Sequence, residues 1–387
     1  MKVTYVTTFD LENPNSWPRR HLGLYGAGAK IIQTLRAAGT DVSSLGPLGR
    51  KRNLVAKVKG KIYRTLYKKN FYGGVDPAVA KHHADQINER LSSVKTDILL
   101  CPENAVPIAN IKTDVPTVLW TDTTLGSLVD FYPYLSNLCQ ETRKNIFELE
   151  KRALDNCSLI ILNSDWASEQ AQQLYGVSPE KIKVIPRGAS QKQTLSDEAF
   201  ETALAAKRKQ ACKLLFIGVD WQRKGGDTAF GIAEVLNAQG IETELHIVGC
   251  KPPYEVPNFV KLHGFIDKST TAGQETLSEL FKTAHFLLYP SKADAMGVVL
   301  SEAASYGVPS LASDVGGISS VVKANVTGKT FAPGSKPEKY GEFVAEQMGG
   351  DRYSNLARST FEHYKNFVSW PAVGEQAVQA FEALLAK

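Results

Sequence analysis

Short apolar segments of strand length alternate with longer segments of helical period through most of the chain, and this alternation limits the fold more than any other feature. Strands that alternate with helices favour parallel sheets with helices on both faces. The first series of expected strands covers residues 3–7, 97–101, 117–120, 159–162 and 183–185, and the helices expected between them cover residues 28–38, 76–91, 140–155 and 165–175.

The pattern restarts after a polar stretch at residues 190–210 that has no strand signal. A chain of 387 residues is too long for one ordinary hydrophobic core. We therefore predict two doubly wound, Rossmann-like α/β domains joined near Gly188, and an amphipathic helix over residues 370–385. The strands expected in the second series cover residues 213–218, 244–248, 259–262, 286–289 and 309–312.

The composition, 43% hydrophobic and 22% charged, is typical of a soluble globular protein. No apolar run reaches the length of about 18 residues that a membrane-spanning helix needs. The N-terminus also lacks the charged and apolar regions of a signal peptide, so we expect a cytoplasmic protein. The five cysteines have no C-x-x-C spacing, and neither a metal site nor a disulfide framework is expected.

The segment of residues 50–69 breaks the charge balance, because it holds nine Lys or Arg residues and no acid. Its apolar residues recur every four positions, at Leu54, Val58, Ile62 and Leu66. A basic amphipathic helix of this kind can lie on an anionic membrane, here the inner face of the membrane. The alternative is a solvated helix or loop whose apolar face packs on the N-terminal sheet. Nucleic acid is not expected as a partner, because no stacking platform or recognised binding motif accompanies the charge.

A strand, a polar loop and the start of a helix are expected in residues 289–304. In an open α/β sheet, ligands bind outside the carboxyl ends of the strands, where helix N-termini offer free N–H groups. Gly297 would let the backbone approach a phosphate, with Asp294 in the loop and Glu302 inside the helix. Carboxylates at such a terminus suit a ligand that also carries hydroxyl groups. The alternative is a helix cap and an exposed surface charge.

Arg223 and Lys224 follow the first expected strand of the second domain and precede a helix that begins after Gly226. Arginine offers a planar fork of donors and lysine a compact charge, so the pair would neutralise a diphosphate. The alternative is a solvated pair without a ligand. Their position at the carboxyl end of a strand makes binding about as well supported as the solvated pair.

Together, these stretches make residues 213–324 similar to the donor domain of the retaining GT-B glycosyltransferases called family 4. The signature of that family is a carboxylate, seven residues and a glutamate, which here is Asp294-(x7)-Glu302. The other matching motifs are Lys224-Gly225, Tyr306-Gly307-Val308-Pro309 and Ser313-Asp314-Val315-Gly316-Gly317-Ile318, with Val184-Ile185-Pro186-Arg187-Gly188-Ala189 at the interdomain junction and Ser369-Trp370 at the start of the last helix.

The resemblance implies a GT-B fold with an acceptor-binding domain of residues 1–188, completed by a helix of residues 370–387 that crosses back to it, and a donor-binding domain of residues 189–369. It implies retaining transfer of a hexose-type sugar from a nucleotide-diphospho-sugar, with UDP favoured over GDP. The acceptor would be a glycan or lipid-linked hydroxyl in cell-surface glycan or lipopolysaccharide biosynthesis. No cofactor and no metal are implied, because basic side chains and a helix N-terminus take the place of a metal.

The resemblance also assigns roles within the donor domain. Glu302 would hold the ribose hydroxyls, Asp294 would contact the transferred sugar as a catalytic residue, and Arg223 and Lys224 would bind the diphosphate. The other donor-binding residues that it implies are Gly297, Val298 and Val299, whose backbone would lie over the sugar and pyrophosphate, and Gly264, Phe265 and Ile266, which would line the base pocket.

The chain departs from the family at several positions. Asp294 stands where glutamate is usual, and Val219 stands where an arginine usually follows the strand glycine. Many members have a histidine after the fourth strand of the first domain, where the ionisable residue here is Asp122. We assign Asp122 a catalytic role in orienting the acceptor or the sugar.

The loop that follows the opening strand borders the phosphates and the acceptor in this family. Gly26 and Gly28 resemble a turn that approaches the donor phosphates. Arg19 and Arg20 would meet an anionic acceptor, and His21 is the third acceptor candidate.

Two other functions remain open. A nicotinamide-dependent oxidoreductase would need G-x-G-x-x-G after a strand, and the third glycine is replaced by Ile31 when the motif is aligned on Gly26 and Gly28. A catalytically silent nucleotide-sugar-binding protein is the other alternative, because Val219 and Asp122 depart from the family.

Overall fold

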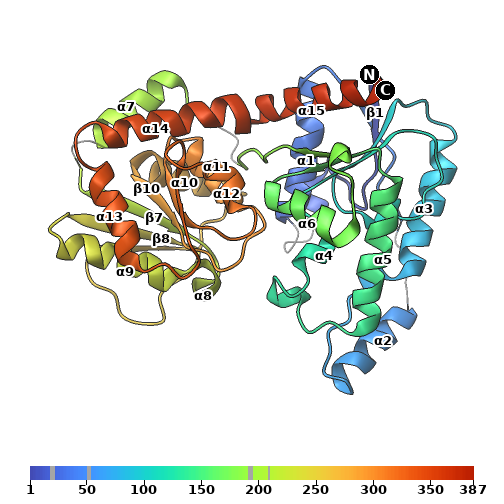
Figure 1. The fold of residues 1–387 in the computed structure, drawn as a ribbon, viewed down its shortest axis with the longest axis horizontal. Coiled ribbons are helices and arrows are strands. Elements are labelled where there is room, and N and C mark those ends of the chain that lie inside the picture. Colours follow the sequence, from blue (N-terminus) through green and yellow to red (C-terminus); the bar gives the residue numbers. More distant parts are fainter. Residues whose placement is uncertain (18–21, 50–53, 191–194, 208–209) are drawn as a thin grey trace. The chain divides into compact units, whose positions relative to one another are not determined.

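The computed structural model describes residues 1–17, 22–49, 54–190, 195–207 and 210–387. The chain divides into two compact units (Figure 1). Unit 1 consists of Met1–Pro186 and Trp370–Lys387, and unit 2 is Arg187–Ser369. The division therefore falls after Pro186, slightly before the junction expected at Gly188.

Unit 1 is built on a six-stranded sheet in the order β2-β1-β3-β4-β5-β6, and all its strands are parallel. Its strands are β1 (Lys2–Tyr5), β2 (Asp41–Ser44), β3 (Ile98–Cys101), β4 (Thr117–Thr121), β5 (Leu159–Leu162) and β6 (Ile182–Val184). The edge strand β2 was not predicted, because only Val42 of its four residues is buried and the segment has no apolar run.

Helices cover both faces of this sheet (Figure 1). Successive β3 residues alternate between two cores: Leu99 and Cys101 pack on one side, and Ile98 and Leu100 on the other. The first core includes α3 (Pro77–Leu91), α5 (Gln140–Asn156) and α6 (Asp165–Tyr175), and the second includes α1 (Leu22–Ala37) and α15 (Trp370–Leu385). The remaining α-helices described in unit 1 are α2 (Leu54–Thr65) and α4 (Leu125–Leu128).

The C-terminal helix α15 belongs to unit 1 and packs beside α1, so the helix expected over residues 370–385 is confirmed. Val373, Ala377 and Phe381 bury the apolar face of α15. A Cβ at Gly374 would lie 2.6 Å from Cγ2 of Thr34 on α1, so glycine at this position permits the close approach of the two helices.

Unit 2 has a second six-stranded parallel sheet, in the order β12-β11-β10-β7-β8-β9. Its strands are β7 (Cys212–Ile217), β8 (Thr243–Val248), β9 (Val260–Gly264), β10 (Phe286–Tyr289), β11 (Ser310–Ser313) and β12 (Gly328–Phe331). Its helices are α7 (Asp197–Lys207), α8 (Trp221–Lys224), α9 (Gly226–Ala238), α10 (Thr271–Thr283), α11 (Val298–Ala304), α12 (Ile318–Val321), α13 (Pro337–Gln347) and α14 (Arg352–His363).

Two cores again lie on opposite faces of the sheet. Leu214 and Phe216 of β7 pack into the core that contains α9, α13 and α14, and Leu215 packs into the core that contains α10, α11 and α12. The predicted fold of two doubly wound α/β domains is therefore confirmed. Within the described part of the chain, no helix is both long enough and apolar enough to cross a bilayer.

Candidate functional site

The strand order of unit 2 reverses direction between β7 and β10. From β7 the chain builds outward through β8 and β9, and from β10 it builds the other way through β11 and β12. Doubly wound sheets bind ligands at the carboxyl ends of the strands at such a switch point. The loops after β7 and β10 carry the residues that the sequence analysis singled out.

The loop after β7 is shaped by a helix cap and a glycine. Asp220 caps the short helix α8 by accepting a hydrogen bond from the backbone N–H of Arg223 at 3.0 Å. Gly225 ends α8 with a φ of 77°, and a Cβ there would lie 2.0 Å from the carbonyl oxygen of Pro290. This close approach brings Arg223 and Lys224 against the end of β10.

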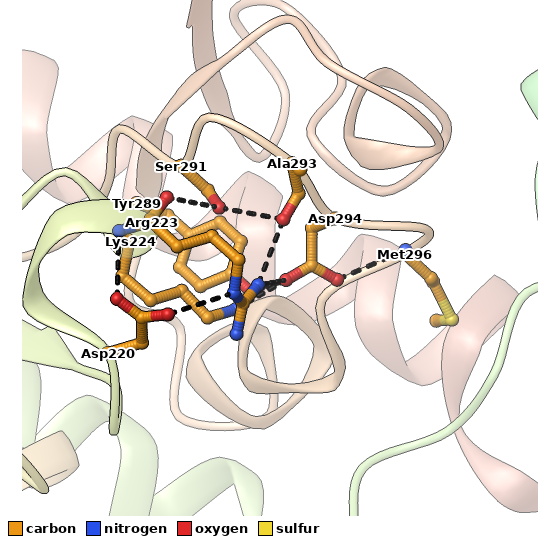
Figure 2. Close-up of polar contacts among 8 residues, drawn as sticks. All are labelled: Asp220, Arg223, Lys224, Tyr289, Ser291, Ala293, Asp294 and Met296. Carbon is orange, nitrogen blue, oxygen red and sulfur yellow. Dashed lines mark hydrogen bonds and ion pairs between the residues drawn. The ribbon is translucent and has the colours of Figure 1, made fainter. Parts of the chain in front are cut away.

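Lys224, Tyr289 and Asp294 form a polar cluster at the switch point (Figure 2). The Lys224 ammonium contacts both the Asp294 carboxylate and the Tyr289 hydroxyl. The Tyr289 hydroxyl in turn donates to Oδ2 of Asp294 at 2.5 Å. The side chains of Lys224 and Asp294 are only 11% and 12% exposed, so this is an ion pair largely removed from solvent. Tyr289 was not identified from the sequence.

The guanidinium of Arg223 lies between two carboxylates (Figure 2). Its Nη1 donates to the carbonyl oxygen of Ala293 at 2.9 Å and lies 3.6 Å from Oδ2 of Asp294, while its Nε lies 3.6 Å from Oδ2 of Asp220. Arg223 and Lys224 are thus brought together with Asp294 as the sequence predicts. Val219, which replaces the usual arginine, is 69% exposed.

The ion pair decides the charge state of Asp294. Burial would raise the pKa of this carboxyl, but the Lys224 charge and hydrogen bonds from Lys224 and Tyr289 outweigh it, so the pKa lies below its ordinary value. Burial also lowers the pKa of Lys224, against the pull of Asp294. The arrangement holds a carboxylate and two cationic side chains in a small volume, which suits a ligand that carries both phosphate and hydroxyl groups.

Glu302 lies in α11 and is fully buried. Both of its carboxylate oxygens accept hydrogen bonds from Nζ of Lys268, at 2.8 Å and 2.6 Å. The alternative of an exposed surface charge at Glu302 is therefore wrong. Lys268 was not identified from the sequence, because it lies in a polar loop after β9 with no local motif.

Gly297 precedes α11 with a φ of 75°, a conformation that favours glycine. The backbone that follows includes Val298 and Val299, which are half-buried. Gly264 ends β9 with a φ of 64°, and the next side chain, Phe265, is 75% exposed. Ile266 packs against the second core of unit 2. The exposed ring of Phe265 is available for stacking, and the base-pocket role of Gly264, Phe265 and Ile266 stays a prediction.

The residues expected from the first domain lie in unit 1. Asp122 follows β4, and its Oδ1 accepts a hydrogen bond from Nδ2 of Asn163 at 2.6 Å. Arg19, Arg20 and His21 lie outside the described residues. Gly26 and Gly28 lie within α1, so the turn predicted there is wrong. A Cβ at Gly28 would lie 3.3 Å from the carbonyl oxygen of Pro102, and this glycine instead lets α1 approach the loop after β3.

A buried carboxylate that the sequence did not reveal lies at the corresponding point of unit 1, where the strand order reverses between β1 and β3. Glu103 follows β3 and is 1% exposed. It accepts hydrogen bonds from the backbone N–H and the hydroxyl of Thr8, at 3.2 Å and 3.0 Å, and from the hydroxyl of Thr7. Glu103 therefore ties together the loops after β1 and β3. Over the described parts of both units, no group of three or more His, Cys, Asp or Glu residues could hold a metal ion.

Two family models match the chain. Residues 29–192 match Glycosyltransferase Family 4, and residues 199–354 match Glycosyl transferases group 1. The chain carries two glycosyltransferase family domains. The second of these domains contains Arg223, Lys224, Asp294 and Glu302, and the first contains Asp122.

Curated proteins similar to these glycosyltransferase domains carry related names. D-inositol 3-phosphate glycosyltransferase from Paenarthrobacter aurescens is 26% identical over 248 residues, which cover 57% of this chain and 60% of the relative. Lipopolysaccharide glucosyltransferase WaaG from Escherichia coli is 26% identical over 184 residues, which cover 46% of this chain and 49% of the relative. The matches thus span 49% to 60% of the length of these two relatives.

Solved structures share the fold over nearly the whole chain. The lipopolysaccharide outer core galactosyltransferase WaaB has a TM-score of 0.63 at 14% identity, covering 99% of this chain and 100% of that one. HepE from Anabaena, solved in complex with UDP, has a TM-score of 0.61 at 15% identity with the same coverage. These likenesses show that the two glycosyltransferase domains form a GT-B fold.

Proposed function

We propose that this protein transfers a hexose from a nucleotide-diphospho-sugar, preferably a UDP-sugar, to an acceptor hydroxyl with retention of configuration. One observation carries the proposal: Arg223 and Lys224 converge with Asp294 at the switch point of unit 2. A diphosphate needs cationic groups, and a sugar needs hydrogen-bond acceptors for its hydroxyls. This site offers both within one cluster.

The diphosphate would bind beside Lys224 and Arg223. Both cations already face Asp294, so the donor would share or replace ion pairs that exist within the protein. The charge that develops on the departing diphosphate would then be balanced by groups that are already oriented, which lowers the reorganisation needed in the transition state. These two side chains are proposed to take the place of a metal ion in the transfer.

The rest of the donor has matching partners in unit 2. Glu302 is a buried carboxylate able to accept hydrogen bonds from the ribose hydroxyls, with Lys268 beside it. The exposed ring of Phe265 would stack on the base. Asp294 would accept a hydrogen bond from a hydroxyl of the transferred sugar. A uridine nucleotide is favoured because HepE, which shares the fold, has been solved with UDP-glucose, and the relative from Escherichia coli is named a glucosyltransferase.

Retention requires the acceptor to attack the face from which the diphosphate departs. The departing phosphate oxygen is the proposed proton acceptor, and the protein contributes placement and charge balance. Asp122 of unit 1 would orient the acceptor or the sugar. The acceptor is proposed to be a glycan or a lipid-linked hydroxyl of the cell surface, in keeping with the names of the lipopolysaccharide enzymes WaaG and WaaB.

The test is to incubate the protein with UDP-glucose, UDP-galactose, GDP-mannose and ADP-glucose and to measure release of the nucleoside diphosphate. Proton NMR of the sugar released by slow hydrolysis gives its first-formed anomer. Turnover with UDP-hexoses, an α-anomer from an α-donor and no loss of rate in EDTA are expected. Nucleotide-induced stabilisation without turnover of any donor would instead indicate the catalytically silent binding protein, and a β-anomer would contradict retention.

A further inference from the structure

The basic helix α2 is attached to unit 1 by a different side from the one that its sequence suggests. Of its residues, only Ala56, Lys59, Gly60 and Tyr63 are half-buried, and they lie on one side because they are three or four positions apart. The apolar residues of the segment face solvent. They are Leu54, Val55, Val58, Ile62 and Leu66, at 68%, 63%, 58%, 42% and 71% exposed.

The attached side is held by polar and aromatic contacts. Nζ of Lys59 lies 2.5 Å from Oε1 of Glu141 on α5, and the Tyr63 hydroxyl donates to Oε2 of the same carboxylate at 3.1 Å. The Tyr63 ring also stacks on Phe71, with the ring centroids 5.7 Å apart. A solvated helix would normally bury its aliphatic stripe against the body of the protein. The alternative that the apolar face packs on the sheet is therefore wrong.

A basic flank borders the aliphatic stripe. Lys57, Lys61 and Arg64 are exposed and project from the side of α2 that lies between the attached side and the stripe. No acidic residue occurs between Leu54 and Lys69. The stripe and this flank, defined as the α2 surface, therefore combine exposed aliphatic groups with one sign of charge.

An exposed aromatic residue, Tyr67, directly follows Leu66 of the α2 surface. The segment after α2 is held to residues 136–139 by backbone hydrogen bonds, from Asn70 N to Asn137 O and from Cys139 N to Asn70 O, each 2.9 Å long. Tyr67 lies between α2 and this bridge and is 63% exposed, with its ring centroid 5.7 Å from that of Tyr63 on α2. Tyrosine is enriched at the boundary between hydrocarbon and headgroups, where its ring and hydroxyl meet different surroundings.

We propose that the α2 surface docks on an anionic lipid bilayer. Val58, Ile62 and Leu66 enter the headgroup and acyl boundary, while Lys57, Lys61 and Arg64 reach anionic headgroups beside them. A second copy of this chain is the less suitable occupant, because a symmetric contact through this surface would bring like charges together. The proposal does not rest on the proposed function, since lipid alone is its ligand.

The experiment is co-sedimentation of the full chain with vesicles of phosphatidylcholine alone or mixed with phosphatidylglycerol. Binding to the anionic vesicles only is expected, and it should weaken as the screening length falls from about 10 Å at 0.1 M salt to about 3 Å at 1 M. Replacing Lys57, Lys61 and Arg64 with Gln should lower the partition coefficient about tenfold or more. Replacing Val58, Ile62 and Leu66 with Gln should lower it by a similar factor.

A matched control removes the same charge elsewhere on unit 1, by replacing Lys95, Lys112 and Lys183, which are exposed outside the α2 surface, with Gln. This variant should bind like the wild type, and melting curves check that all three variants are folded. The proposal is overturned if the wild type ignores anionic vesicles at 0.1 M salt, or if the control loses as much binding as the α2 variants. Sedimentation velocity without lipid that shows a dimer broken by the α2 variants would also overturn it, in favour of a second copy.

Discussion

Nζ of Lys268 lies 2.6 Å from Oε2 of Glu302, and it is the only cation within ion-pair distance of that carboxylate among the described residues. Glu302 is fully buried, whereas the Lys268 side chain is 45% exposed. The lysine therefore reaches from solvent to a carboxylate that cannot reach solvent itself. A ribose bound at Glu302 must share this carboxylate with Lys268 or displace the lysine.

Glu302→Ala should weaken nucleotide binding. Each ribose hydroxyl would lose a charged acceptor, and hydrogen bonds to charged groups contribute about 1.5–3 kcal/mol, which corresponds to a loss of affinity of about ten- to a hundredfold. Isothermal titration calorimetry with UDP measures the change. Glu275→Ala is the matched control, because Glu275 is an exposed acid on α10. Unchanged UDP affinity in Glu302→Ala would remove Glu302 from the donor site.

Lys224→Ala should separate phosphate binding from base and ribose binding. The diphosphate would lose a charge-assisted hydrogen bond, so the affinity for UDP should fall about ten- to a hundredfold while the affinity for uridine changes little. The control is Lys339→Ala, which removes an exposed lysine of α13. Equal losses for UDP and uridine in Lys224→Ala would indicate a distorted fold or another site.

Apolar runs predicted the interior of both sheets, and β5 and β10 have the predicted bounds. The edge strands β2 and β12 were missed, because their sequences Asp-Val-Ser-Ser and Gly-Lys-Thr-Phe contain no apolar run. The other two edge strands, β6 and β9, were predicted, so it is the lack of an apolar run and not the edge position alone that hid β2 and β12.

Long-range contacts explain what else the sequence left open. Spacing predicted the carboxylates Asp294 and Glu302 but not Lys268, which lies 34 residues before Glu302 in a loop without a motif. It also predicted a helix at α2 but not which side is attached, since that side is fixed by Glu141, 82 residues after Lys59. Local patterns carry no information on such partners.

His285 should make stability depend on pH. It is fully buried between two backbone groups: its Nδ1 accepts from the N–H of Lys213 at 3.0 Å, and its Nε2 lies 3.1 Å from the carbonyl oxygen of Lys207. This arrangement fits only the neutral ring with its proton on Nε2. Burial, with the charges of Lys207 and Lys213, lowers the pKa of His285 to about 4.

Folding lowers the pKa of His285, so its neutral ring contributes fully to the free energy of unfolding at pH values above about 6.5, the pKa of histidine in the unfolded chain. This contribution is lost as the pH falls toward 4. Between pH 7 and pH 5 the loss should be about 2 kcal/mol. Urea unfolding of the wild type and His285→Asn at both pH values measures it, since other titrating groups contribute equally to both proteins. The same pH dependence in the two proteins would contradict the assignment.

Asp294→Asn should affect catalysis and stability in different ways. If Asp294 contacts the transferred sugar, kcat should fall about ten- to a hundredfold, while the Kd for UDP changes by a smaller factor. The substitution also leaves the Lys224 ammonium, whose side chain is 11% exposed, beside a neutral amide, which should destabilise the fold by about 3 kcal/mol at pH 7. Because folding lowers the pKa of Asp294, its contribution is present above the unfolded value of about 3.9 and is lost only as pH falls through the lower folded value. The variant should therefore be less stable than the wild type by the same amount at pH 7 and at pH 5.

The double variant Asp294→Asn with Lys224→Met removes the unpaired charge and should recover stability but not kcat. Recovery of both would show that the single variant loses activity only because the Lys224 ammonium is left unpaired, and that transfer needs neither side chain. No loss of either kcat or stability in Asp294→Asn would remove Asp294 from the site.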